Sequence, residues 1–91
     1  KTLDRASRIY YGGGKLKGRT RRMAAEILNL YGIALVMAGF EPGRAEPLFI
    51  EAGELSPDWP DPVFNLGYVY EKIGAKQDAD EQYKIYKSMQ R

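Results

Sequence analysis

Two pairs of glycines with the same internal spacing constrain the fold of this chain more than any other feature. Gly32 precedes Gly39 by seven residues, and Gly67 precedes Gly74 by the same distance, so the second pair repeats the first after 35 residues. A fixed period of roughly 20–50 residues is typical of stacked supersecondary units, each of which needs a neighbour to bury its apolar face. The spacing therefore predicts a repeat architecture.

The match between the two halves continues beyond the glycines. Ala45 and Phe49 follow the first pair of glycines, and Ala79 and Tyr83 follow the second, the two residues being four positions apart in both cases. Residues four apart lie on one face of a helix. Small residues allow two antiparallel helices to approach closely, and large residues fill the space between successive pairs. We therefore expect each repeat to be a pair of packed helices.

Apolar residues recur every three or four positions in four segments, as they do in amphipathic helices. No stretch alternates as a half-buried strand does, so we expect an all-α fold. The apolar stripes are Ala24, Leu28, Tyr31, Leu35 and Ala38 in residues 20–39; Ala45, Phe49, Ala52 and Leu55 in residues 44–55; Val63, Leu66, Tyr70 and Ile73 in residues 61–74; and Ala79, Tyr83, Tyr86 and Met89 in residues 77–90.

Residues that favour helix ends flank these segments. Thr20 is expected to cap the first helix, because a threonine side chain can accept a hydrogen bond from a free backbone N–H. Gly39 is expected to end it. Pro47 fits the first turn of the second helix, where its missing N–H has no partner. Asp61 is expected to cap the third helix, with Pro62 as the first helical residue.

The charge is distributed unevenly along the chain. Residues 1–24 carry eight basic side chains and one acidic one, a net charge of +7, whereas the rest of the chain carries six basic and eleven acidic ones, a net charge of −5. The basic part contains one more short helix, expected over residues 2–11 and ended by Gly12–Gly14. Such a segment favours an anionic partner, or it docks on the acidic body of its own chain or of a second copy.

Residues 25–91 resemble the tetratricopeptide repeat, a helix–turn–helix unit of about 34 residues. The second unit carries the segment "NLGYVYEKIG" followed by Ala79 and Tyr83. The first unit matches at Gly32, Leu35, Gly39, Ala45, Phe49, Ala52 and Pro57. It departs from the family pattern at Tyr31, where leucine is usual, and by one extra residue in the turn "FEPGR"; in the second unit, Tyr86 occupies a position that is usually small. The resemblance divides the chain into a basic helix and glycine-rich connector (1–24) and two repeats (25–59 and 60–91).

The resemblance implies a right-handed α-solenoid of antiparallel helix pairs that binds protein segments and has no catalytic activity. In this family the first helix of each unit lines a concave groove for a peptide or a helix. The positions that correspond to the groove are Asn29, Ile33, Val36, Met37, Phe64, Asn65, Tyr68, Glu71 and Lys72. Some members clamp a C-terminal carboxylate with Lys, Asn and Arg; Asn29 and Asn65 match that set, whereas Lys72 is the one basic residue among the groove positions.

The last helix predicts that the chain packs against further repeats or against a second copy of itself. Two repeats are fewer than the roughly three that a stable array needs. The last helix is apolar along Tyr83, Ile85, Tyr86 and Met89, whereas the terminal helix of a repeat array normally has a polar outer face. We therefore expect the chain to self-associate or to form part of a longer array.

The stretch "YYGGGKLKGRTRR" resembles a phosphate-binding loop but lacks two of its parts. Arg19 stands where that loop has lysine, and no strand precedes it. Two interpretations remain open. The glycines connect two helices and the basic residues face water, or the segment is a patch that binds nucleic acid, an anionic lipid surface or an acidic protein segment. The residues of the patch are Lys15, Lys17, Arg19, Arg21 and Arg22.

The composition narrows the chemistry further. The sequence has no cysteine and no histidine, so disulfides, thiolate nucleophiles and the usual zinc ligands are excluded. We expect no metal or cofactor and no enzymatic activity, because the carboxylates are scattered and no Ser or Lys has a base beside it. No apolar run approaches the roughly 20 residues that cross a bilayer. A soluble protein is expected, and the choice between cytoplasm and periplasm stays open.

Overall fold

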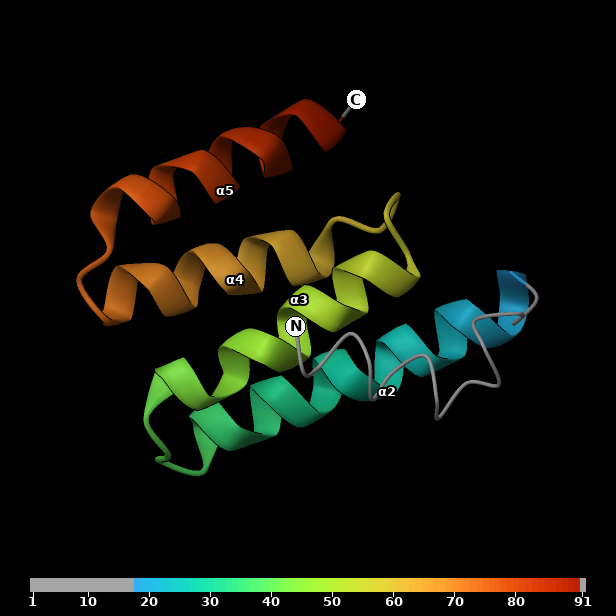
Figure 1. Cartoon of the computed structure of the whole chain (residues 1–91), viewed down its shortest axis with the longest axis horizontal. Helices are drawn as coiled ribbons and strands as arrows, with labels where there is room; N and C mark the ends of the chain where they lie inside the picture. The colour runs from blue at the N-terminus through green and yellow to red at the C-terminus, as the bar shows by residue number, and fades with distance from the viewer. Residues whose placement is uncertain (1–17, 91) are drawn as a thin grey trace.

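The computed structural model describes residues 18–90, which form four α-helices and one short 3-10 helix and contain no strand (Figure 1). This confirms the all-α prediction for the described part of the chain. The helix expected over residues 2–11 lies outside the described residues. The elements are α2 (Gly18–Met37), η1 (Pro42–Ala45), α3 (Glu46–Leu55), α4 (Asp61–Lys72) and α5 (Lys76–Met89).

The helices form two antiparallel pairs that lie side by side. In Figure 1, α2 and α3 run in opposite directions, and α4 and α5 do the same one layer further along. α4 packs against α3 and also contacts α2, so the second pair docks onto the first through its leading helix. The loop from Ser56 to Pro60 separates the pairs, as its prolines indicate.

The leading helix of each pair ends in the same way. Gly39 and Gly74 have φ angles of 93° and 87°, the left-handed conformation that a residue with a side chain adopts only with strain. Beyond each glycine the chain turns back on the helix. The backbone N–H of Phe40 donates to the carbonyl of Leu35 at 3.1 Å, and that of Ala75 donates to Tyr70 at 2.8 Å. These bonds satisfy helix-end carbonyls. They confirm Gly39 as the end of the first helix.

The predictions for the helix starts were wrong at two of three positions. Thr20 lies inside α2, whose described part begins at Gly18, and a capping residue would need non-helical backbone angles. Asp61 is the first residue of α4 and makes no capping bond, because the carbonyl of Pro60 already accepts the N–H of Val63 at 3.1 Å. Pro47 lies in the first turn of α3 as expected.

Two glycines bring the paired helices into close contact. A Cβ atom on Gly32 would lie 2.6 Å from Cε1 of Phe49, and one on Gly67 would lie 2.6 Å from Cε1 of Tyr83. Carbon atoms at optimal separation are about 3.5–4.0 Å apart, so neither position has room for a side chain. The core is the cluster where the first pair meets α4, formed by Ala45, Phe49, Leu66 and Val69.

The apolar stripe predicted for the first helix is not its buried face. α2 buries Ala25, Asn29 and Gly32, whereas Tyr31 is 56% exposed and Ala38 is also exposed. The reason is that α2 carries apolar residues around its whole circumference, so that periodicity alone does not select a face. The close approach of α3 at Gly32 decides the rotation. The stripes of α3 and α5 point inward as predicted, and in α4 Ile73 alone departs, being 49% exposed.

Candidate peptide-binding groove

A hollow of about 240 Å³ lies between the leading helices of the two pairs, α2 and α4. Seven residues line it, and six of these were predicted to line a groove. The seventh, Phe49 of α3, was not predicted there, because its repeat position indicated a core residue. Its side chain forms part of the floor of the hollow. The lining residues are Ile33, Val36, Met37, Phe49, Phe64, Asn65 and Tyr68.

The walls of the groove remain open to solvent despite their apolar side chains. Met37 is 82% exposed, Phe64 44% and Tyr68 37%. Phe64 is held in place from behind, because its ring lies 5.5 Å from that of Tyr83 and 5.1 Å from that of Tyr86, measured between centroids. Exposed apolar surface that is fixed in position is typical of binding sites.

Two asparagines join the helices at one side of the groove. Asn65 of α4 donates a hydrogen bond from Nδ2 to Oδ1 of Asn29 of α2, at 3.0 Å. Asn29 was predicted to line the groove, but it is only 4% exposed and lies behind Asn65. It therefore supports the groove from inside the fold. In Asn65, which lines the groove, the second amide N–H and the carbonyl oxygen have no partner among the described residues. Asn65 therefore keeps one donor and one acceptor on the groove.

Lys72 stands at the edge of the groove rather than in its lining. Its Nζ lies 5.4 Å from the ring centroid of Tyr68, a distance at which the ammonium is attracted to the ring face. On the same helix, Glu71 accepts a hydrogen bond from the hydroxyl of Tyr83 at 2.9 Å. Glu71 is therefore occupied by a structural contact, and Lys72 supplies a positive charge beside the groove.

Two tyrosine hydroxyls are bonded to carboxylates. The Tyr70 hydroxyl donates to Oε2 of Glu46 at 2.7 Å, linking α4 to α3, and that of Tyr83 donates to Glu71 as described. Burial, reinforced by these hydrogen bonds to carboxylates, raises the pKa of Tyr70 to about 12 and that of Tyr83 to about 12. Both effects favour the neutral phenol, because a phenolate would be poorly solvated and would repel the carboxylate.

These two tyrosines are expected to lower the free energy of unfolding at alkaline pH. A tyrosine in the unfolded chain ionises near pH 10. Since both pKa values are higher in the folded chain, their contribution to the free energy of unfolding is complete below pH 10 and is lost as the pH rises through 12. We expect this free energy, measured by urea unfolding, to fall less steeply over that range in Tyr70→Phe than in the wild type. Tyr31→Phe, at an exposed position, is the control; equal slopes in all three proteins would contradict the prediction.

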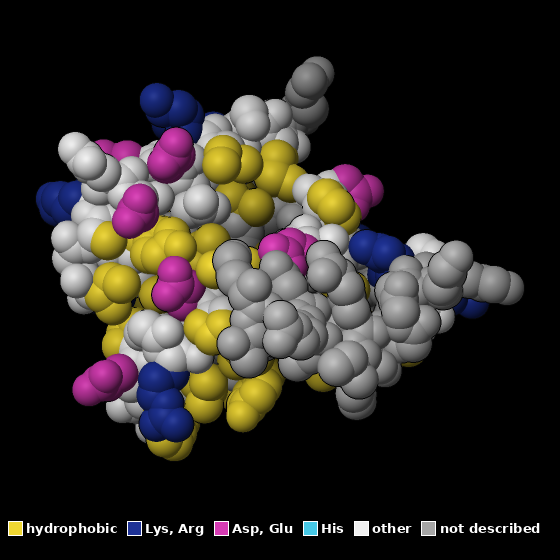
Figure 2. All heavy atoms as spheres, in the orientation of Figure 1, with side chains coloured by type: hydrophobic (Ala, Val, Ile, Leu, Met, Phe, Trp, Pro, Cys, Tyr) yellow, Lys and Arg dark blue, Asp and Glu magenta, His cyan; other side chains and the backbone are white. Residues whose placement is uncertain are grey.

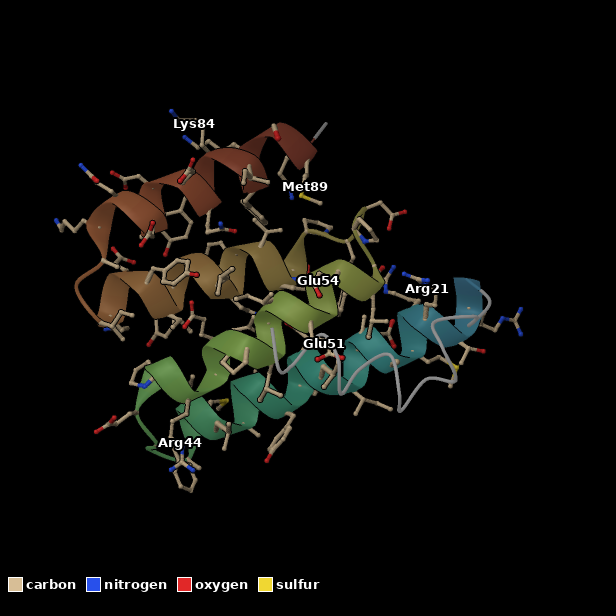
Figure 3. All side chains as sticks on the ribbon, viewed as in Figure 1. Arg21, Arg44, Glu51, Glu54, Lys84 and Met89 are labelled. Carbon is tan, nitrogen blue, oxygen red and sulfur yellow. The ribbon has the colours of Figure 1, made fainter. Side chains whose placement is uncertain are left out.

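Two arginines near the start of α2 contact the end of α3 and the loop that follows it. Arg21 donates from Nε to the carbonyl of Leu55, the last residue of α3, at 3.4 Å, and Figure 3 shows its side chain at that end of α3. The guanidinium of Arg22 lies over the ring of Trp59, 4.3 Å from its centroid, with its Nε 3.2 Å from Glu26. Of the predicted anion ligands, Arg19 is exposed, and Lys15 and Lys17 lie outside the described residues.

A second hollow, of about 360 Å³, was not anticipated from the sequence. It lies between α3, α4 and α5, and its residues include Ile50, Val63, Tyr70 and Ile85. Figure 2 shows hydrophobic side chains exposed among acidic ones over α4 and α5. Ile85 is 44% exposed. No pattern in the sequence distinguishes these positions from the rest of each amphipathic helix.

No protein-family model, curated protein or solved structure matches this chain. Within residues 18–90, no helix is long and apolar enough to cross a membrane. In the same residues, no three Asp or Glu side chains are grouped so that they could hold a metal ion.

Proposed function

We propose that this chain is a non-catalytic binding module of the tetratricopeptide type, and that it holds a protein segment in the groove between α2 and α4. The observation that carries the proposal is the groove itself. Six of its seven lining residues are aliphatic or aromatic, yet three of them are more than a third exposed. A monomeric protein rarely leaves such side chains together in water unless they bind something.

The recurrence of the packing contacts supports a solenoid of this type. The Gly32–Phe49 contact is repeated by Gly67 and Tyr83, and the glycine-ended helix at Gly39 is repeated at Gly74. In such an array each helix pair rotates slightly relative to the one before it, so that the leading helices line a concave surface. A right-handed superhelix is part of this proposal.

The chemistry of the groove favours an extended peptide over a helix. A backbone amide offers one donor and one acceptor, which matches the second amide N–H and the carbonyl oxygen of Asn65. The backbone amides of a helix are bonded within the helix and are not free to pair in this way. An apolar side chain of the peptide would fill the hollow beside Tyr68, and an acidic one would be attracted to Lys72.

Selection from a random library of displayed peptides tests this proposal. Peptides that bind the wild-type chain are expected to bind Tyr68→Ala and Asn65→Ala at least about tenfold more weakly, because each change removes about 1.4 kcal/mol or more of contact. Phe40→Ala is the matched control, since Phe40 is an exposed aromatic residue (45%) that does not line the groove.

The outcome depends on comparing the variants at equal fold content, checked by circular dichroism. If peptides bind all four proteins with one affinity, the groove is not the binding site. The alternative, an adaptor that binds nucleic acid or an anionic surface through the basic segment, stays a prediction. Within the described residues, its Arg21 and Arg22 are engaged in contacts inside the chain.

A further inference from the structure

The outward face of α2 is a continuous apolar stripe. Met23, Ile27 and Leu30 are 56%, 65% and 64% exposed, and Ala34, one turn beyond Leu30, is exposed as well. The opposite face of the helix is buried against α3 and α4. A helix that is apolar on all sides normally lies between two neighbours. α2 therefore has one neighbouring surface in the chain and lacks another among the described residues.

The repeat indicates what kind of surface the stripe fits. A shift of 35 residues relates Ile27, Leu30 and Ala34 of α2 to Pro62, Asn65 and Val69 of α4. Those three residues belong to the side of α4 that faces the first helix pair: Pro62 and Val69 are buried, and Asn65 is bonded to Asn29. The stripe on α2 thus occupies the side by which a leading helix docks onto a preceding pair.

The second pair offers the matching surface at the other end of the molecule. The position that corresponds to Asn29 is Phe64, and the one that corresponds to Phe49 is Tyr83. Phe64 is 44% exposed, and its ring packs in tilted arrangements against those of Tyr83 and Tyr86. The surface that receives α4 in the first pair is therefore represented in the second pair by an aromatic cluster that no described element covers.

The two open surfaces differ from the internal contact in a matched way. Inside the chain, the contact between pairs contains the polar couple Asn29 and Asn65. At the open ends, both positions are apolar, namely Phe64 and Leu30. A change at one end alone would place an asparagine against an apolar side chain and leave its amide unpaired, which is costly in a buried contact. The joint change keeps the two ends compatible.

The sizes of the side chains at the two open ends are also matched to each other. Phe49 and Val69 pack in one core cluster within the chain. Their counterparts are Tyr83 and Ala34, so the longer aromatic residue on one end would meet a smaller residue on the other.

We infer that copies of this chain stack head to tail, with the α2 stripe of one copy docked on the Phe64–Tyr83–Tyr86 cluster of the next. The inference rests on the repeat architecture proposed above and not on peptide capture.

Stacking of this kind is heterologous, because two different surfaces meet. Such contacts form open-ended assemblies unless the rotation between copies closes a ring. An alternative contact, α2 against α2 of a second copy, would be symmetric and would stop at a dimer. The two arrangements place different residues together, and so a cross-linking experiment separates them.

The absence of cysteine from the sequence makes the test direct. Chains of residues 1–91 with Leu30→Cys, Phe64→Cys or Lys84→Cys are mixed in pairs and oxidised mildly, and disulfide-linked dimers are counted by mass spectrometry. We expect the Leu30→Cys and Phe64→Cys mixture to form mixed dimers at least about tenfold above the level of any pair that contains Lys84→Cys, an exposed position on α5. Predominant Leu30→Cys homodimers, or no excess for any pair, would overturn the inference; the latter would mean that another part of the chain or another protein covers the stripe.

A second measurement keeps the result independent of oxidation. The average mass of the wild-type chain, 10.3 kDa as a monomer, is expected to rise continuously with concentration in light scattering. Leu30→Asn and Phe64→Asn should each shift that rise to about tenfold higher concentration, and the double variant should reverse most of the shift by recreating the Asn–Asn couple. Additive losses in the double variant would contradict direct contact. Peptide capture is measured on dilute monomer, where stacking does not contribute. A loss of peptide capture therefore tests the groove alone, and a constant mass in light scattering tests the stacking alone.

Discussion

Replacing Phe49 with alanine is expected to leave a large fraction of the chain unfolded in water. Phe49 is 2% exposed, and it is the largest residue of the central core cluster. Removing a buried phenylalanine side chain costs about 3–5 kcal/mol, because the transfer free energy is lost and a cavity remains. A small domain has only about 5 kcal/mol or slightly more in total. Urea unfolding followed by circular dichroism measures the loss.

The second repeat provides the control for this experiment. Tyr83 is the counterpart of Phe49, but it lies on the last helix and is only half-buried. Tyr83→Ala is therefore expected to cost less than half as much as Phe49→Ala, even though it removes a side chain of similar size. Equal losses in the two variants would mean that the stabilising core is not centred where the first pair meets α4.

Replacing Gly32 with alanine is expected to destabilise the fold by about 1–3 kcal/mol, the usual cost of overpacking a core. The new Cβ would lie 2.6 Å from Cε1 and 2.8 Å from Cζ of Phe49. That ring is buried in the core cluster, so the neighbouring side chains must shift with it. In an exposed helix the same change would stabilise by about 1 kcal/mol, because alanine is the better helix former. The steric term is expected to win.

Gly53 separates the two effects within the same protein. It lies inside α3, and a Cβ there would have no atom within 4 Å, so Gly53→Ala is expected to stabilise by about 1 kcal/mol. A Phe49→Leu background should relieve most of the cost of Gly32→Ala by shortening the opposing side chain. The free energies of unfolding of these variants are compared in one series. A stabilising Gly32→Ala would contradict the close helix contact.

Phe49 connects the stability of the fold to the shape of the groove. One side of its ring contacts Gly32, and the ring also forms part of the groove floor. A substitution at either position is therefore expected to alter peptide capture as well as stability. For this reason Tyr68 and Asn65, which are less buried, are the better positions at which to measure binding alone.

Local chemistry made most of the helix map predictable. Gly39 ends a helix because its positive φ angle suits glycine. Pro57 and Pro60 keep the segment between α3 and α4 from becoming helical, because proline lacks the N–H that a helix needs. The starts were harder to predict. A capping side chain competes with backbone carbonyls that serve equally well, as the carbonyl of Pro60 does for α4.

The sequence by itself determined the two helix pairs, their 35-residue period and six of the seven groove residues. The helix pairs and their period follow from the regular spacing of helical side chains. The groove residues follow from the resemblance to the tetratricopeptide pattern. The tertiary structure alone decided which face of α2 is buried and that Asn29 lies behind Asn65. It also decided that Arg21 contacts the end of α3 and that Arg22 contacts Trp59 in the loop that follows. Helical periodicity gives the direction of each side chain around its own axis, but α2 is apolar on every side, so its rotation depends on where α3 approaches most closely, at a glycine whose partner lies 17 residues further along the chain.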